Sequence, residues 1–188
     1  GNGVSRQPID LEKCKQLGTT IGCNAIVRDF APHIISAADP RMVTHVQTLF
    51  QGKIYTRPEW NKRYNVLEYP ELPYQGKDRP DNPWHWNSGP HALNIACQQS
   101  PKKCFLLGFD LTQNKSSNNV YMNTEGYNDK VIDPKYWHYQ INKILECYPQ
   151  IKFVWIVPNA YVCPDEWKKH PNFSRDTIEN FNKYLHAT

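Results

Sequence analysis

The chain has 188 residues, which suits one domain with a single hydrophobic core. Its 22 Lys and Arg against 18 Asp and Glu leave a formal net charge of +4, too small and too dispersed to indicate nucleic-acid binding. Hydrophobic residues make up 39% and aromatic residues 13%, so a core can form and wholesale disorder is excluded. No apolar run approaches the roughly 18 residues that span a bilayer, so we expect no transmembrane helix.

The six cysteines are scattered along the sequence, without a CxxC pair or a Cys/His ligand pair. They lie mostly in apolar stretches, where a reduced cysteine behaves as a small hydrophobic residue. The first residues, Gly1-Asn2-Gly3, do not resemble a signal peptide. We therefore expect a cytoplasmic protein with reduced cysteines and no zinc or other metal site.

Short apolar runs alternate with longer stretches of helical spacing, a pattern typical of an α/β layered fold. The runs at 104–109 and 152–157 are continuously apolar, as expected for parallel strands covered on both faces. Ser174 is expected to cap the last helix. In chain order the pattern predicts a helix at 10–17, strands at 19–26 and 33–37, helices at 41–50 and 90–99, a strand at 104–109, a helix at 135–147, a strand at 152–157 and a helix at 175–186.

The segment 51–87 differs from the rest of the chain, because it is rich in proline, charged and aromatic residues. We interpret it as a loop-rich insert, or a lid over a site, within a single domain that spans residues 1–188. A surface excursion with no functional role is the alternative.

The N-terminal loop, residues 1–5, has the sequence Gly1-Asn2-Gly3-Val4-Ser5 and precedes a predicted helix. A GxG turn in this position leaves backbone N–H groups open to a phosphate, and Asn2 and Ser5 can add side-chain hydrogen bonds. Such a loop ordinarily follows a buried strand. Without one, the sheet has an unfilled position that a partner chain can occupy. A disordered, glycine-rich start is the alternative interpretation.

Polar residues follow three of the predicted strands. In open α/β sheets, ligands bind beyond the carboxyl ends of the strands, where the strand order reverses. Asn24 can hydrogen-bond a ribose or the edge of a base. Asp39 and Asp110 can accept hydrogen bonds from hydroxyls, although each can equally cap the segment that follows it.

Ser88 and Gly89 stand at the predicted start of the helix at 90–99, where an anion or a polar ligand is favoured. Trp84 and Trp86 precede them and can wall a base or a sugar ring. The alternative is a turn whose tryptophans seal the edge of the core.

His138 is the leading candidate for a general base, because an imidazole titrates near neutrality. Asp133 can orient it or act in its place, and His91 and His85 are competitors. An isolated histidine among aromatic residues is more often structural. The sequence contains no P-loop, HExxH, GxSxG or DxD signature.

Taken in order, GNGVS, GCNAI, the Ser88-Gly89 helix start, LLGFD and the strand closing on Val157-Pro158-Asn159 resemble glycosyltransferase family 42, the bacterial sialyltransferases. They are also similar to a wider group of GNGPS-type domains related to pterin pyrophosphokinases. The resemblance covers roughly residues 1–160. It implies a Rossmann-like fold, with a mostly parallel sheet and helices on both faces.

The resemblance also implies a CMP-sugar donor that is held without metal or cofactor. Gly1, Asn2, Gly3 and Ser5 would then face the donor phosphate, Asn24 the nucleotide or sugar, and Ser88 and Gly89 the cytidine. The family's base lies near the start of the penultimate helix, where this chain has Asp133 and His138. Its two loop tyrosines correspond to Thr112 and Asn118, with Tyr121 and Tyr127 further along.

The sequence therefore predicts a nucleotide-sugar-dependent glycosyltransferase that transfers to a hydroxyl acceptor by direct, metal-independent displacement. The acceptor class stays open, and modified DNA is among the possibilities. Two alternatives remain. One is a non-catalytic nucleotide- or glycan-binding module, and the other is phosphate chemistry like that of a pterin pyrophosphokinase.

Overall fold

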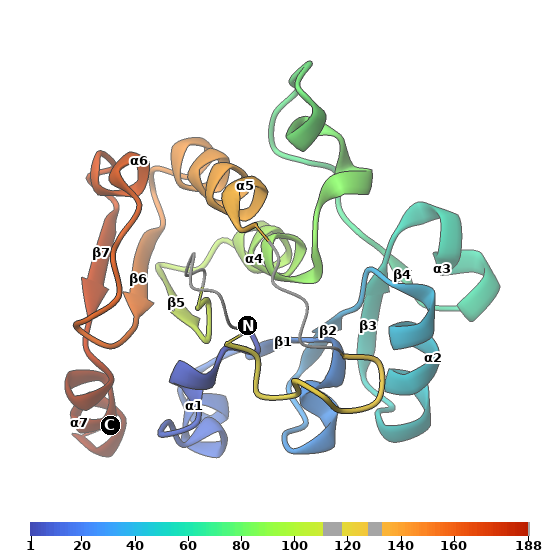
Figure 1. Ribbon diagram of the computed structural model, residues 1–188, viewed down its shortest axis with the longest axis horizontal. Helices are drawn as coiled ribbons and strands as arrows, with labels where there is room; N and C mark the ends of the chain where they lie inside the picture. Colours follow the sequence, from blue (N-terminus) through green and yellow to red (C-terminus); the bar gives the residue numbers. More distant parts are fainter. Residues whose placement is uncertain (111–117, 128–132, 188) are drawn as a thin grey trace.

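The computed structural model describes residues 1–110, 118–127 and 133–187. It has an α/β, Rossmann-like architecture with two parallel sheets and helices packed on their faces (Figure 1). This confirms the fold class expected from the sequence. Most of the polar loop expected at 112–119, including Thr112, lies outside the described residues.

The first sheet has the strand order β1-β2-β3-β4 and the second has the order β5-β6-β7, and every pairing is parallel. β1 and β5 are therefore edge strands, and they face each other across the position where Figure 1 places the N-terminus. The strands are β1 (Ile21–Cys23), β2 (Ile34–Ser36), β3 (Lys53–Thr56), β4 (Leu67–Glu68), β5 (Lys103–Leu107), β6 (Lys152–Ile156) and β7 (Phe173–Asp176).

Helices cover both faces of the sheets. Leu106 of β5 packs into a core with α4 and α5, whereas its neighbours Phe105 and Leu107 pack on the opposite face against α1 and α7. This alternation is the period of two that a strand imposes on its side chains. The α-helices are α1 (Leu11–Leu17), α2 (Pro40–Leu49), α3 (Pro58–Tyr64), α4 (Ser88–Gln98), α5 (Lys135–Cys147), α6 (Asp165–Lys168) and α7 (Ile178–Ala187); the 3-10 helices are η1 (Val4–Arg6), η2 (Asn24–Arg28), η3 (Arg79–Asp81) and η4 (Pro83–His85).

The segment 51–87 is not the loop-rich insert that we expected, because it contributes β3, α3 and β4 to the first sheet. Ile54 and Thr56 of β3 are buried, and Thr56 donates a hydrogen bond to the backbone carbonyl of Ala37 (2.7 Å). The strand is short and begins with a lysine, so its sequence carries no continuous apolar run. Only the stretch that holds η3 and η4 remains irregular.

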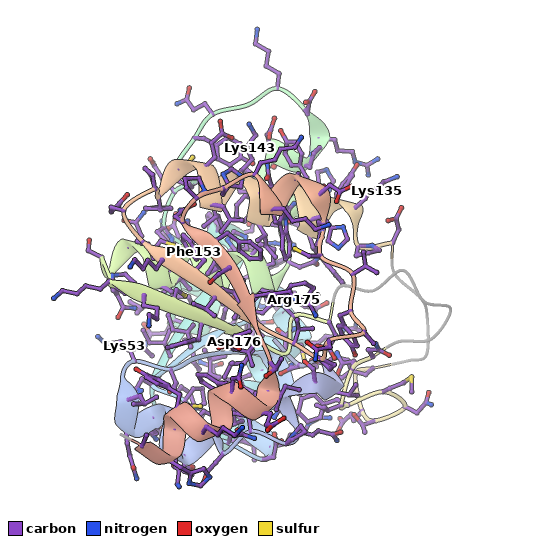
Figure 2. All side chains as sticks on the ribbon, turned by 90° about the vertical axis from the view of Figure 1, so that its left-hand side faces the viewer. Lys53, Lys135, Lys143, Phe153, Arg175 and Asp176 are labelled. Carbon is purple, nitrogen blue, oxygen red and sulfur yellow. The ribbon has the colours of Figure 1, made fainter. Side chains whose placement is uncertain are left out.

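The C-terminal helix begins later than the sequence indicated. Ser174 and Arg175 belong to β7, which pairs with β6 beside Phe153 (Figure 2), so Ser174 is not the N-cap. Thr177 takes that role, because its hydroxyl accepts a hydrogen bond from the backbone N–H of Asn180 (3.1 Å). Pairing with β6 overrode the local helical pattern. The predicted strand 19–26 is also shorter and ends at Cys23, because Asn24 turns the chain with a φ of 50°.

The largest core lies between α4, α5, α6 and the second sheet, around the buried indoles of Trp86, Trp155 and Trp167. A second core joins η2, β2 and α2. All six cysteines are free, and four of them are buried. Among the described residues, no helix is long and apolar enough to cross a membrane.

Candidate nucleotide site at the sheet edge

The N-terminal loop bridges the carboxyl ends of β1 and β5. The amino group of Gly1 donates to the carbonyl of Leu107 (2.7 Å), at the end of β5. Asn2 Nδ2 donates to the carbonyl of Cys23 (2.8 Å), at the end of β1. The loop therefore lies where strand order reverses, since the chain continues outward from β1 through β2 in one direction and from β5 through β6 in the other.

The glycines of this loop permit a close approach to Asp110. A Cβ on Gly3 would lie 2.2 Å from Asp110 Cγ, and Gly108 turns the facing chain with a φ of +65°. The backbone N–H of Ser5 donates to Asp110 Oδ2 (2.8 Å), and the Ser5 hydroxyl donates to Oδ1. Burial raises the pKa of the Asp110 carboxyl, while the hydrogen bonds from Ser5 act in the opposite direction.

This arrangement corrects the expectation that the loop's N–H groups face a phosphate. Gly3 N–H donates to the carbonyl of Gly108 (2.9 Å), Val4 N–H to the carbonyl of Asn118 (2.7 Å), and Ser5 N–H to Asp110. The carboxylate of Asp110 occupies the anion position at Ser5. Asp110 is thus an internal partner of the loop, and its hydrogen bonds hold the loop to the end of β5.

Asn24 and Ser88 do come together, as the sequence predicted for a shared site. Ser88 Oγ donates to Asn24 Oδ1 (2.9 Å) and accepts from the backbone N–H of Ala38 (3.0 Å). The carbonyl of Ser88 accepts from Ser36 Oγ (2.8 Å), which also contacts the hydroxyl of Tyr69 (2.9 Å). The first turn of α4 is thereby tied to the carboxyl ends of β1 and β2.

Tyr127 lies beside this pair. Its hydroxyl accepts from the backbone N–H of Ala25 (3.5 Å), and burial raises its pKa, while hydrogen bonding with Asn24 and Asn2 opposes that rise. Asn2, Asn24, Ser88 and Tyr127 therefore form one amide–hydroxyl cluster, assembled from the N-terminal loop, the end of β1, the start of α4 and the segment at 118–127.

Arg28 adds a positive charge next to the amide–hydroxyl cluster. Its guanidinium carbon lies 5.9 Å from the ring centre of Tyr127 and 5.5 Å from that of Tyr121. Its three hydrogen bonds go to uncharged acceptors, namely His45 Nε2 (2.9 Å), Thr124 Oγ1 (2.8 Å) and the carbonyl of Glu125 (2.7 Å). The half-buried charge of Arg28 thus remains available to an anion.

Arg6 is a different case, because its charge is already neutralised. It is 4% exposed and pairs with Asp29 (3.2 Å), and it also donates to the hydroxyl of Tyr121 (2.8 Å). Tyr121 in turn donates to Asp29. This buried triad fastens the segment at 118–127 to η1 and η2, and it positions Tyr121 against Tyr127, with ring centres 5.8 Å apart.

The base candidates lie in other surroundings. His91 is 1% exposed and stacks on Tyr69 at 3.7 Å, and burial lowers its pKa to about 3, so it is a neutral core residue without access to an acceptor. Asp133 is exposed, accepts from the backbone N–H of Lys135 (3.0 Å) and has a lowered pKa, mainly through that bond. It caps the start of α5. His138 packs edge-on against Trp167 of α6 (5.7 Å).

The remaining predicted residues divide between structure and surface. Trp86 is fully buried and donates to the carbonyl of Pro80 (2.9 Å), so it belongs to the core. Trp84 is 46% exposed and lies under the guanidinium of Arg57 (4.7 Å). Asp39 caps α2 by accepting from Arg41 N–H (2.8 Å). Gly89 lies in the first turn of α4, close to Phe109.

Sequence reasoning did not identify Ser36, Tyr69 and Arg28 as site residues. Ser36 closes an apolar strand, and a polar residue in that position is a usable signal. Tyr69 and Arg28 carry none, because they reach the site through tertiary packing. The described residues contain no group of three or more His, Cys, Asp or Glu side chains that is placed to hold a metal ion.

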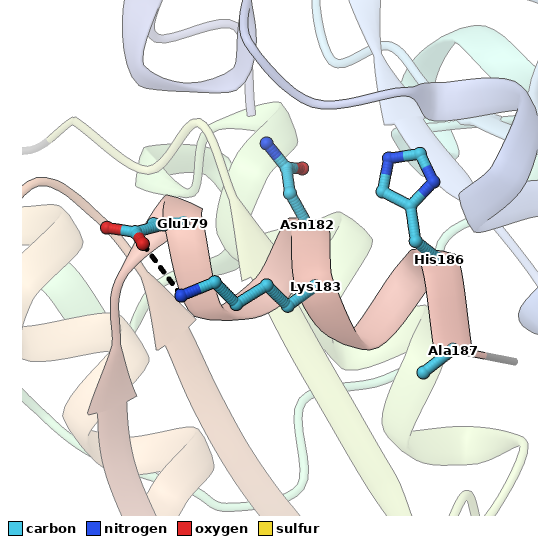
Figure 3. Close-up of a pocket in the computed structure, with 5 residues that line it drawn as sticks. All are labelled: Glu179, Asn182, Lys183, His186 and Ala187. Carbon is cyan, nitrogen blue, oxygen red and sulfur yellow. Dashed lines mark hydrogen bonds and ion pairs between the residues drawn. The ribbon is translucent and has the colours of Figure 1, made fainter.

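One further hollow, of about 440 Å³, lies on α7 (Figure 3). All of its lining residues come from that one helix, and two of them, Glu179 and Lys183, pair with each other at 2.7 Å. No second element encloses a ligand there, so the amide–hydroxyl cluster remains the better candidate. Comparison of the chain with protein-family models, with curated proteins and with solved structures found no match.

Proposed function

We propose that this protein binds the phosphate end of a nucleotide-sugar at the amide–hydroxyl cluster and transfers the sugar to a hydroxyl acceptor. The observation that carries the proposal is the meeting of Asn24, Ser88 and Tyr127 beside the uncompensated charge of Arg28. Amides and hydroxyls suit a ribose or a sugar, and a guanidinium suits a phosphate.

The reaction would be a direct displacement. The acceptor oxygen attacks the anomeric carbon, the bond from that carbon to the phosphate oxygen breaks, and the nucleotide leaves with the electron pair. Tyr127 and Arg28 would stabilise the charge that develops on the departing phosphate. The proton of the acceptor hydroxyl must pass to a base, for which His138 in the first turn of α5 remains the candidate.

Tyr127 takes the part that the sequence comparison left unfilled. The resemblance requires loop phenols near the donor phosphate, and the chain has no tyrosine at Thr112 or Asn118. The segment at 118–127 instead carries Tyr121 and Tyr127 to the N-terminal loop, where Tyr121 is engaged by Arg6 and Asp29 and Tyr127 faces the two asparagines.

The first test is a thermal-shift panel of nucleoside mono- and diphosphates, each with and without Mg²⁺. A ligand at about 100 times its Kd adds roughly 2.7 kcal/mol to stability, or about 5–11 °C in Tm for a chain of this size. We expect stabilisation without metal, strongest with cytidine nucleotides. The variant Arg28→Gln should lose most of the shift, whereas Arg41→Gln, which changes an exposed arginine away from the cluster, should retain it.

Stabilisation by triphosphates only when Mg²⁺ is present would contradict the proposal and favour pyrophosphoryl transfer. No shift with any nucleotide would remove the nucleotide site altogether.

A non-catalytic binding module is the second candidate, and the placement of His91 and Asp133 favours it, because neither is available as a base. Turnover separates the two functions. If the protein is a transferase, Tyr127→Phe should lower kcat by about 10²-fold and leave nucleotide binding within a few-fold, since the phenol acts mainly in the transition state. Nucleotide binding with no sugar transfer to any hydroxyl acceptor would favour the binding module.

A further inference from the structure

A groove of about 520 Å³ separates the two sheets. Its walls are the edge strands β1 and β5, its floor is formed by α1 and α7, and its roof is α4. In the described structure β1 pairs only with β2, and β5 pairs only with β6, so both edges that border the groove lack a neighbouring strand.

The side chains around the groove are those of a sheet interior. Ile21 comes from β1, Phe105 and Leu107 from β5, Leu17 from α1, and Ala92 and Ala96 from α4. Although β5 is continuously apolar, Phe105 and Leu107 are only partly buried. The two alanines lie one helical turn apart, which leaves room between α4 and the level of the sheet.

The distance between the edges is bridged by the N-terminal loop at one end only. The nitrogen of Gly1 donates to the carbonyl of Leu107, the last residue of β5, in the manner of a ladder amide. The side chain of Asn2 reaches the carbonyl of Cys23, the last residue of β1. A chain that runs into Gly1 from the groove therefore travels parallel to both edges, which is the direction of every other strand.

The amino group of Gly1 is also in an unfavourable position for a charge, because burial lowers its pKa. A peptide N–H at the same atom would make the same hydrogen bond to Leu107 with no charge to desolvate.

We propose that this groove is a strand-binding slot, filled by an extended, apolar segment of about five residues that is joined to the nitrogen of Gly1 and pairs in parallel with both β1 and β5. The segment would join the two sheets into one continuous sheet and bury the partly exposed apolar residues of β5. Both edges would then be protected from pairing with other chains. The inference is independent of the proposed function.

The test is an N-terminal extension of the full chain. One version places Val-Ile-Val-Ile-Val directly before Gly1, and a matched version places Ser-Asp-Pro-Ser-Asp there, which cannot be buried and lacks one donor. We expect the apolar extension to raise Tm by roughly 10 °C over the polar one. We also expect it to slow amide exchange in β1 and β5 at least about tenfold relative to β7.

The variant Ala96→Phe locates the effect, because its ring would occupy the slot from α4. The gain in Tm from the apolar extension, measured against the polar extension in each background, should largely vanish in Ala96→Phe. Equal Tm and exchange for the two extensions would overturn the proposal, and so would an undiminished gain in Ala96→Phe. A gain that grows with protein concentration would place the strand in a neighbouring copy and overturn the covalent arrangement.

Discussion

His91 makes the stability of this protein depend on pH in a way that can be worked out from the structure. Its ring is 1% exposed and stacks on Tyr69, and burial lowers its pKa from 6.5 to about 3. The unfolded chain therefore takes up a proton near pH 6.5, whereas the folded protein does not. Stability from this residue is complete above pH 6.5 and is lost as the pH falls from about 6.5 towards 3.

The size of the effect follows from those two pKa values. Between pH 7.5 and pH 5 the proton taken up by the unfolded state lowers the free energy of unfolding by roughly 2 kcal/mol. For a chain of this length that corresponds to a fall in Tm of about 4–8 °C. The buried ring has no carboxylate partner named among the groups that act on its pKa, so burial dominates the shift.

The assay is urea unfolding at pH 7.5 and at pH 5 for the natural chain and for His91→Phe, which keeps a flat ring against Tyr69 but cannot titrate. Carboxylates contribute to the pH dependence of both proteins, so the difference between them isolates His91. His186→Gln, a change to an exposed histidine, is the matched control and should behave as the natural chain does. Equal loss of stability in His91→Phe and the natural chain would refute the reasoning.

Two further predictions test the local structure, both by the free energy of unfolding in urea. Gly3→Ala should cost at least about 2 kcal/mol, because the new Cβ would overlap Asp110, whereas Gly18→Ala, which meets nothing within 4 Å, should change stability by no more than about 0.5 kcal/mol. A similar cost at both glycines would contradict the close approach. Thr177→Ala should cost about 1 kcal/mol through the lost cap of α7, and Ser174→Ala should be nearly neutral; the reverse order would restore Ser174 as the cap.

The fold class was accessible from the sequence because two of its signals are local. The continuous apolar runs that became β5 and β6 required burial on both faces, and short apolar runs alternating with helical periods indicated parallel α/β units. Caps such as Asp39 before Pro40 were also readable. The segment at 51–87 was misinterpreted because β3 is a short strand whose stability comes from pairing with β2 and from the buried Ile54.

The candidate site shows the same division. The sequence by itself brought Asn24 and Ser88 to one region, because residues that follow parallel strands or open the adjoining helices meet at one edge of the sheet. Only the tertiary structure decided that Asp110 takes the N–H of Ser5 and that His91 is a neutral core residue. Those outcomes depend on desolvation and on contacts between residues far apart in the chain. Local spacing carries no record of either quantity.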